Sequence, residues 1–402
     1  MFNRQAYEMG AAPNRIRQIF EYGRQQAKLV GEEKVYDFSL GNPSIPAPAT
    51  VNQSIHRLLD TESSIRIHGY TSSAGGDLLR EAVARNLTER FGVKAAARNV
   101  FITCGAAPAL ESVLVALRTE HSEIVGIAPY FMEYKAFTEA NGSRFVLVPA
   151  DLENFQVNIP ALAAAVNENT QAVILNSPNN PSGAILTAET LHAVAALLTE
   201  RSAQYGHPIY IIADEPYREL VYGDAEVTFI PRVYRDTIVC YSWSKSLSMP
   251  GERIGYVFVP EEATDSHDLF LAIAGAARAS GHICAPSLIQ RAVAENIDCM
   301  PDLEAYKVNR KLLYEGLTAI GYECVRPDGA FYLFVKTPGG DNDAFCEKAM
   351  AKNLLVVPSE PFGVEGYFRL GYCVSKDMIE RALPVFRAVF EEMLQDSGNG
   401  MD

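Results

Sequence analysis

The chain has 402 residues, of which 48% are hydrophobic and 21% are charged. This is an ordinary composition for a soluble globular protein with more than one hydrophobic core, and it excludes a disordered or fibrous class. The 35 basic and 49 acidic residues give a net charge of −14 without any block of like charge, so we expect no nucleic-acid partner.

The seven cysteines are widely scattered, and no two of them form a C-x-x-C pair. An odd, dispersed set indicates neither a zinc site nor a disulfide framework, so we expect reduced thiols and no metal. The N-terminus lacks the apolar core of a signal peptide, and no uninterrupted apolar stretch is long enough to span a bilayer. We therefore predict a cytoplasmic protein with no membrane partner.

Two helices and one turn are predicted in the first hundred residues. Residues 13–29 have an apolar stripe at helical spacing, and Pro13 suits the first turn of that helix. Glycine and proline then bracket a polar turn around Gly41. In 79–91 apolar residues recur at every fourth position, and Gly92 follows as an expected helix end.

Apolar strands and amphipathic helices alternate from about residue 100 onward. Segment 209–213 is almost wholly apolar, as expected of a strand buried on both faces of a parallel sheet. The pattern predicts a large α/β domain over 46–294 with a mostly parallel sheet. The expected strands cover 100–103, 124–128, 145–149, 172–176, 209–213, 238–241 and 254–259, with helices around 131–141, 187–203 and 262–277.

Beyond about residue 295, long amphipathic helices flank short strands. This pattern predicts a smaller α+β domain over 295–402, to which we also assign part of the N-terminal arm, residues 1–45. Pro384 lies within the last helical pattern and is expected to kink that helix or to divide it. The polar tail over 395–400 is expected to be disordered. The expected elements are helices over 302–320 and 375–394 and strands over 331–336, 354–357 and 367–371.

Polar residues follow several of the large domain's strands at the point where each strand ends. Ligands of parallel α/β sheets bind outside the carboxyl ends of the strands. One strand leads into the small-residue turn 105–107, where the amide groups of a helix start suit a phosphate. Each segment alone also resembles an ordinary turn or helix cap. Their recurrence at successive strand ends, at 176–183, 214–217 and 242–245, favours a site.

Lys245 follows a run of β-forming residues and is flanked by serines. An amine at the mouth of a parallel sheet can form a Schiff base with an aldehyde cofactor when its surroundings lower its pKa. Arg253 lies eight residues later, and its planar guanidinium suits a phosphate. The alternative is a surface lysine after a buried strand, and this stretch alone leaves that alternative open.

Five ordered motifs resemble those of the class I and II aminotransferases, the fold-type I enzymes that use pyridoxal 5′-phosphate. The resemblance extends from Gly41 to the C-terminal helix, and it implies a seven-stranded, mostly parallel sheet in the large domain. The motifs are N-N-P-S-G at 179–183, D-E-P-Y at 214–217, S-W-S-K at 242–245, E-R-I-G at 252–255 and F-R-L-G at 368–371.

The resemblance implies three catalytic residues. Lys245 would hold the cofactor as a Schiff base and then carry a proton to and from the substrate. Asp214 would pair with the pyridine nitrogen and keep it protonated, which makes the ring an electron sink. Tyr217, together with Asn180, would bond the ring hydroxyl.

The resemblance also implies a set of binding residues. The phosphate would be held by Ser242, Arg253, Gly105, Ala106 and Ala107; many relatives carry hydroxyl residues at the two alanine positions, so backbone contacts would replace side-chain contacts there. Phe131 would stack on the ring, although a core aromatic residue is its alternative reading. Arg369, assisted by Gly41 and Asn180, would bind the substrate α-carboxylate. Tyr70 would reach the phosphate of a partner subunit, which implies a homodimer with shared active sites.

The predicted function is transfer of an amino group from an L-amino acid to a 2-oxo acid by a ping-pong mechanism. A carbon–sulfur β-lyase of the same fold is the alternative, because it needs the same Lys245, Asp214 and Arg369. A non-catalytic, cofactor-binding regulator is the third reading, and the short stretch before Gly41 disfavours it. In relatives that act on dicarboxylic acids, a second arginine, often from the partner chain, takes the distal carboxylate. The corresponding stretch of this chain contains Arg278 and His282, neither of which aligns with that role, and the identity of the amino acid stays open.

Overall fold

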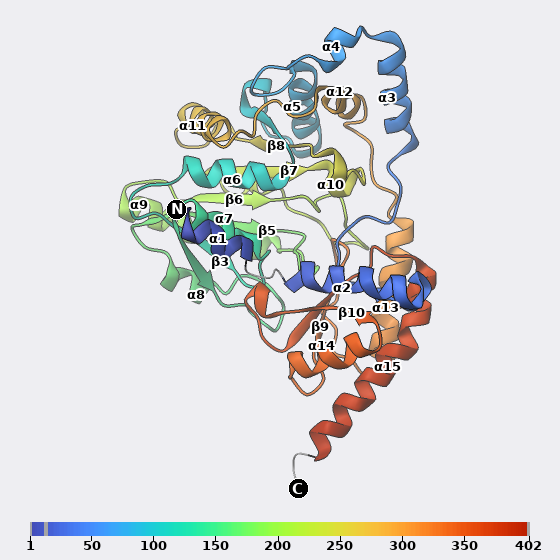
Figure 1. Ribbon diagram of the computed structural model, residues 1–402. Coiled ribbons are helices and arrows are strands. Elements are labelled where there is room, and N and C mark those ends of the chain that lie inside the picture. The colour runs from blue at the N-terminus through green and yellow to red at the C-terminus, as the bar shows by residue number, and fades with distance from the viewer. Residues whose placement is uncertain (1, 12–14, 400–402) are drawn as a thin grey trace.

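We analysed a computed structural model, which describes residues 2–11 and 15–399 (Figure 1). The predicted helix over 13–29 corresponds to α2 (Arg15–Val30), while Pro13 lies outside the described residues. A preceding helix, α1 (Arg4–Ala11), was not predicted. In the part of the chain that the structure describes, no helix has the length and apolar character needed to cross a membrane.

The large domain is built on a seven-stranded sheet with the strand order β2-β8-β7-β6-β5-β3-β4. Strand β8 runs antiparallel to both of its neighbours, and the other neighbouring pairs are parallel. The prediction of a mostly parallel seven-stranded sheet is confirmed. The strands are β2 (Val100–Thr103), β3 (Glu123–Ile127), β4 (Arg144–Val148), β5 (Thr170–Asn176), β6 (Tyr210–Asp214), β7 (Thr237–Ser242) and β8 (Gly255–Phe258).

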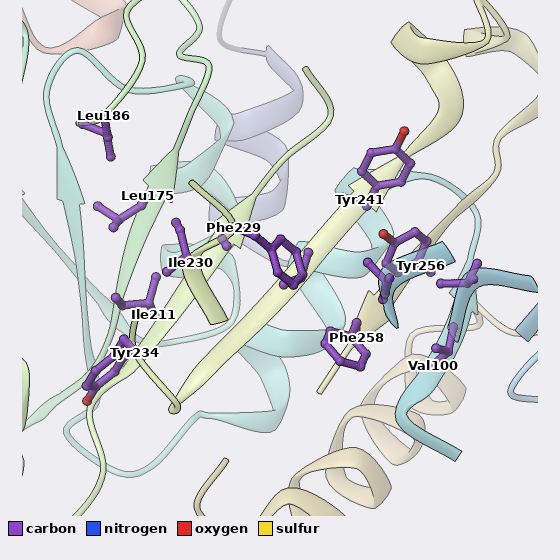
Figure 2. Close-up of a cluster of buried hydrophobic side chains, with 14 of the residues drawn as sticks. Val100, Leu175, Leu186, Ile211, Phe229, Ile230, Tyr234, Tyr241, Tyr256 and Phe258 are labelled. Carbon is purple, nitrogen blue, oxygen red and sulfur yellow. The ribbon is translucent and has the colours of Figure 1, made fainter. Parts of the chain in front are cut away.

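Helices cover both faces of this sheet because successive side chains of each strand point to opposite faces. Ile211 packs in the cluster of buried side chains shown in Figure 2, and its neighbour Ile212 packs in the cluster on the opposite face. The first face is covered by α3 (Ala49–Thr61), α5 (Asp77–Phe91), α8 (Ile159–Ala165), α9 (Ala188–Tyr205) and α12 (Ser287–Glu295). The second is covered by α6 (Ala106–Ala116), α7 (Glu133–Ala140) and α11 (Ser266–Ala279).

The predicted end of the helix at Gly92 is confirmed. Gly92 has a φ of 67° and follows α5, and its amide donates to Thr88 O. That left-handed conformation is common at helix ends and favours glycine, because a side chain there is strained. The short helices α4 (Ser64–His68) and α10 (Trp243–Ser246) complete the large domain.

The smaller domain has its own core and lies below the sheet in Figure 1. Strands β11 (Val357–Pro358), β12 (Tyr367–Gly371) and β9 (Tyr332–Lys336) form an antiparallel sheet. The N-terminal strand β1 (Tyr36–Asp37) pairs in parallel with β10 (Leu354–Leu355), so the start of the chain adds to this domain. The exact boundaries at residues 45 and 294 stay predictions. The helices of the smaller domain are α13 (Glu304–Ile320), α14 (Asn342–Ala351) and α15 (Lys376–Asn399).

The expectation of a division at Pro384 was wrong, and so was that of a disordered tail over the described residues 395–399, whereas a kink at Pro384 stays a prediction. The helix runs without interruption from Lys376 to Asn399 with Pro384 inside it. Buried Ile379 and Phe386 pack into the core on either side of the proline, which holds both halves of the helix in place. The tail is helical to Asn399, and an ion pair of 2.9 Å joins Asp396 to Lys348; residue 400 lies outside the described part of the chain.

Candidate active site

A cavity of about 330 Å³ lies at the carboxyl ends of the central strands. The polar strand ends that were singled out in the sequence meet there, as parallel strands require. Gly105 and Tyr70 are not among the residues that line the cavity. The predicted site residues that do line it are Gly41, Ala106, Ala107, Phe131, Asn180, Asp214, Tyr217, Ser242, Lys245, Arg253 and Arg369.

Lys245 enters the cavity from the single turn of helix that follows β7. The Ser242 hydroxyl caps this turn by accepting a hydrogen bond of 3.1 Å from the Ser244 amide. Lys245 Nζ donates to Gly41 O at 2.7 Å, and no described carboxylate lies within ion-pair distance of it. Burial, assisted by the positive charges of Arg253 and Arg369, lowers the pKa of Lys245 to about 8. Near neutral pH the amine can therefore act both as a nucleophile and as a base.

Asp214 is a buried carboxylate with one satisfied and one unsatisfied oxygen. Its Oδ2 accepts a very short hydrogen bond from the Tyr134 hydroxyl, and its Oδ1 has no partner. Asn176 Nδ2 donates to the backbone carbonyl of Asp214 at 2.8 Å and fixes the strand end. Burial raises the pKa of Asp214 to about 7, and the hydrogen bond from Tyr134 opposes this rise because it favours the charged form. The free oxygen suits a positively charged N–H donor on a ligand.

Arg369 is a buried cation without a counter-ion in the described chain. Its Nη1 donates to Asn180 Oδ1 at 3.0 Å and its Nη2 to Ser39 O at 2.6 Å, whereas its Nε is buried and has no partner. Its guanidinium carbon lies 4.6 Å from the ring centre of Tyr332 and 5.1 Å from that of Phe362. A buried positive charge held only by neutral groups forms a site for a small anion such as a carboxylate.

The turn before α6 is shaped around Arg253. Gly105 has a φ of 97°, and a Cβ at this position would lie 2.7 Å from Arg253 Nη2. Arg253 itself is exposed at the rim, and its Nη1 donates to Pro250 O at 3.0 Å. The start of α6, at Ala106, thus lies beside the guanidinium of Arg253. Among the described residues, no carboxylate forms an ion pair with this guanidinium. Amide groups and a fixed positive charge together suit a phosphate.

Tyr217 is part of a pair of phenols. Its hydroxyl lies 3.1 Å from that of Tyr332, and burial raises the pKa of both groups. A side chain at Gly41 would collide with the Tyr332 hydroxyl, so the Gly41 segment approaches this ring closely. These contacts hold Gly41, Tyr217 and Arg369 together around the ring of Tyr332.

Of the remaining predicted residues, one lines the cavity and three do not. Phe131 lines it and packs edge-on to Tyr134, with ring centres 5.6 Å apart. Tyr70 is 97% exposed and does not line this chain's own cavity. Arg278 is exposed on α11, and His282 lies 3.8 Å from Glu111; neither lines the cavity.

Tyr134 and Tyr332 are the two site residues that the sequence analysis did not select. Tyr134 is in the first turn of α7 and lies three positions after Phe131, which precedes the helix; within the predicted helix 131–141 that spacing was the available signal. Tyr332 belongs to a strand that is buried at every position except its last, so nothing local distinguishes it from a core aromatic residue.

A buried ionic cluster supports the segment that carries Asp214 and Tyr217. Arg218 donates to Glu215 at 2.8 Å and to Glu219 at 3.4 Å, and Arg90 bonds Glu219 through two contacts of 2.6 and 2.9 Å. The two arginines balance the two carboxylates, which makes burial of the cluster tolerable. In the described chain, no cluster of three or more potential metal ligands occurs.

Solved structures of aminotransferases resemble this chain over nearly its whole length. An aminotransferase from Eubacterium rectale is 48% identical, with a TM-score of 0.95, and the match covers 98% of this chain and 99% of that one. The aspartate aminotransferase from Thermus thermophilus with maleate is 26% identical, with a TM-score of 0.86, over 97% and 99% of the two chains. The fold is therefore that of the fold-type I aminotransferases.

Sequence comparison places the chain in the same group. A probable aspartate/prephenate aminotransferase from Aquifex aeolicus is 30% identical over 381 residues, which cover 89% of this chain and 92% of the relative. The sequence model described as "Aminotransferase class I and II" matches residues 33–386. That match spans most of the chain, including every motif quoted above. The chain belongs to the class I and II aminotransferase family.

Proposed function

We propose that this aminotransferase holds pyridoxal 5′-phosphate in the cavity and moves an amino group from an L-amino acid to a 2-oxo acid in two half-reactions. The observation that carries the proposal is the unpartnered Oδ1 of buried Asp214, which faces the same cavity as Lys245 and Arg369. A protonated ring nitrogen would satisfy that oxygen, and this chemistry fits the cofactor.

Each part of the cofactor has a matching group in the cavity. Arg253, Ser242 and the turn 105–107 would hold the phosphate. Asp214 would hold the ring nitrogen, while Tyr217 and Asn180 would bond the ring hydroxyl, with Phe131 against the ring face. Lys245 would tether the cofactor through its amine.

When bound, the cofactor supplies an electron-withdrawing ring next to the carbon that carries the amino group. Lys245 Nζ, with its pKa lowered to about 8, would take the proton from the substrate Cα and would pass it to C4′ of the cofactor, as amino transfer requires. Tyr134 favours the charged form of Asp214 by donating to Oδ2. The buried surroundings exclude water from these groups and strengthen their electrostatic interactions.

The substrate α-carboxylate would bind Arg369, whose Nε has no partner and whose other nitrogens are fixed by Asn180 and Ser39. Arg369 belongs to β12 of the small domain, whereas Lys245 and Asp214 belong to the large domain. Substrate binding would therefore draw the two domains together over the reacting atoms.

Tyr70 supports a homodimer with shared active sites. Because Tyr70 is 97% exposed in a single chain, its hydroxyl is available to contact the cofactor phosphate in a second copy. The cytoplasmic location stays a prediction.

Spectroscopy of single half-reactions tests the proposed function. Mixing the cofactor-loaded protein with an amino acid should convert the bound cofactor to its amine form and release one equivalent of 2-oxo acid, and a 2-oxo acid should reverse the change. Release of pyruvate and ammonia from cystathionine without amino transfer would instead establish the β-lyase reaction.

A further inference from the structure

Tyr217 and Tyr332 form a pair of buried phenols in the wall of the cavity. The two residues are 5% and 3% exposed, and both line the cavity. Their hydroxyl oxygens lie 3.1 Å apart, and either hydroxyl can be the donor of this hydrogen bond. Each phenol carries one proton, so one bond between them uses only one of the two protons. Among the described residues no acceptor for the second proton occurs, so it is available to a ligand in the cavity.

Both phenols keep their protons near neutral pH. Burial raises the pKa of each hydroxyl, and the nearby positive charge of Arg369 opposes this rise without cancelling it. The pair therefore offers the cavity a hydrogen-bond donor and not a phenolate base. The ligand atom that suits such a donor best is an oxygen that carries negative charge.

The proposed function, on which this inference rests, supplies the acceptor for the second proton. Tyr217 would donate its single proton to the ring hydroxyl oxygen of the cofactor. The oxygen of Tyr217 can then only accept, so the hydroxyl of Tyr332 becomes the donor of the 3.1 Å bond. A phenol that accepts a hydrogen bond is itself a stronger donor, because successive hydrogen bonds polarise one another.

Packing and backbone bonds hold the two rings in place without help from the hydroxyls. The ring of Tyr217 packs edge-on to those of Phe331 and Tyr332, with ring centres 5.6 and 5.7 Å away. The Ala330 amide donates to Leu220 O at 2.9 Å and so ties the segment after Tyr217 to the residues before β9. Removing the Tyr332 hydroxyl should therefore leave both rings in position, and its effect on the cofactor can be measured in a folded protein.

We propose that Tyr332 is a positioning residue for the cofactor: its hydroxyl donates to Tyr217 and strengthens the hydrogen bond from Tyr217 to the ring hydroxyl oxygen. Tyr332 belongs to β9 of the small domain and Tyr217 follows β6 of the large domain, so the chain of bonds joins the two domains at the ring. In the bound cofactor this oxygen shares a proton with the nitrogen of the Lys245 tether. A stronger donor makes the oxygen a poorer acceptor for that proton, so Tyr332 lowers the pKa of the tether.

The pH dependence of bound-cofactor absorbance tests the proposal without any turnover. Tyr332→Phe keeps the ring and removes the donor, so the pKa of the tether should rise by about half a unit to one unit. Tyr322→Phe is the matched control, because it removes another buried hydroxyl of the small domain, which donates to Phe386 O at 2.9 Å and does not line the cavity. Its titration should match that of wild type. A titration of Tyr332→Phe that also matches wild type would overturn the inference.

A double-mutant cycle shows whether Tyr332 acts through Tyr217. In Tyr217→Phe the ring oxygen has already lost this donor, so adding Tyr332→Phe should cause no further shift in the pKa of the tether. An equal shift in the wild-type and Tyr217→Phe backgrounds would mean that Tyr332 acts independently of Tyr217, and it would overturn the inference while leaving the proposed function intact. Failure of the wild-type protein to take up pyridoxal 5′-phosphate would instead overturn the proposed function itself.

Discussion

Tyr134 donates a hydrogen bond to Oδ2 of Asp214 and leaves Oδ1 of the same carboxylate free. The two residues lie 80 positions apart, on α7 and at the end of β6. The bond favours the charged carboxylate, while burial favours the neutral acid and raises its pKa to about 7. Tyr134 thus holds Asp214 close to the boundary between its two protonation states.

Tyr134→Phe should make Asp214 harder to ionise. A hydrogen bond to a charged group contributes about 1.5–3 kcal/mol, which corresponds to a shift of about one to two pKa units upward. The acid limb of the pH profile for cofactor affinity should move to higher pH by about that amount. Tyr130→Phe, which removes a neighbouring phenol whose ring centre lies 6.5 Å from that of Tyr134, is the control. Superimposable profiles for Tyr134→Phe and wild type would show that the bond does not tune Asp214.

Cofactor uptake by the cofactor-free protein should depend on the protonation of Lys245. Only the neutral amine attacks an aldehyde, so the rate should rise with pH and level off above about pH 8, where burial places the pKa of Lys245. Stopped-flow absorbance from about pH 6 to about pH 11.5 measures the uptake rate, and Lys245→Ala reports the background from surface lysines. An inflection near the ordinary lysine value of 10.5 would contradict the lowered pKa.

Arg369→Ala should weaken the binding of every amino donor to a similar extent. Loss of a buried charge partner of the α-carboxylate costs about 2–5 kcal/mol, so KM should rise about 100-fold or more. Cofactor absorbance should persist, because Arg369 contacts Ser39 and Asn180 rather than the Arg253 turn. Arg310→Ala, in the small domain outside the cavity, is the control. Unchanged kinetics for Arg369→Ala would remove this residue from the site.

Tyr70→Phe should reduce cofactor affinity although Tyr70 is 97% exposed in a single chain. One neutral hydrogen bond contributes about 1 kcal/mol, which corresponds to roughly fivefold in the cofactor Kd. Titration of the cofactor-free protein measures this change, with Tyr314→Phe, on the half-buried Tyr314 of α13, as the control. Identical affinities for Tyr70→Phe and wild type would argue against a site shared between two copies.

The sequence was sufficient to predict elements whose signals are local. The apolar run 209–213 and the polar residues behind it located β6 and Asp214, and the motif around Lys245 located the end of β7. The fold prediction succeeded because buried parallel strands have a distinctive composition.

Features that depend on contacts across the chain could not be predicted in the same way. The Tyr134–Asp214 and Tyr217–Tyr332 pairs join residues 80 and 115 positions apart, and no local pattern specifies them. The possible division of the last helix at Pro384 was wrong because tertiary packing of Ile379 and Phe386 outweighs the local cost of proline in a helix.

The most direct test of the central claim is borohydride reduction of the cofactor-loaded protein followed by peptide mapping. A single reduced cofactor adduct should appear on Lys245, and Lys245→Ala should yield none. Lys336→Ala, which removes an exposed lysine paired with Glu323, should yield the same adduct as wild type. A reduced adduct on any other lysine, or an adduct that survives in Lys245→Ala, would contradict the assignment of Lys245 as the tether.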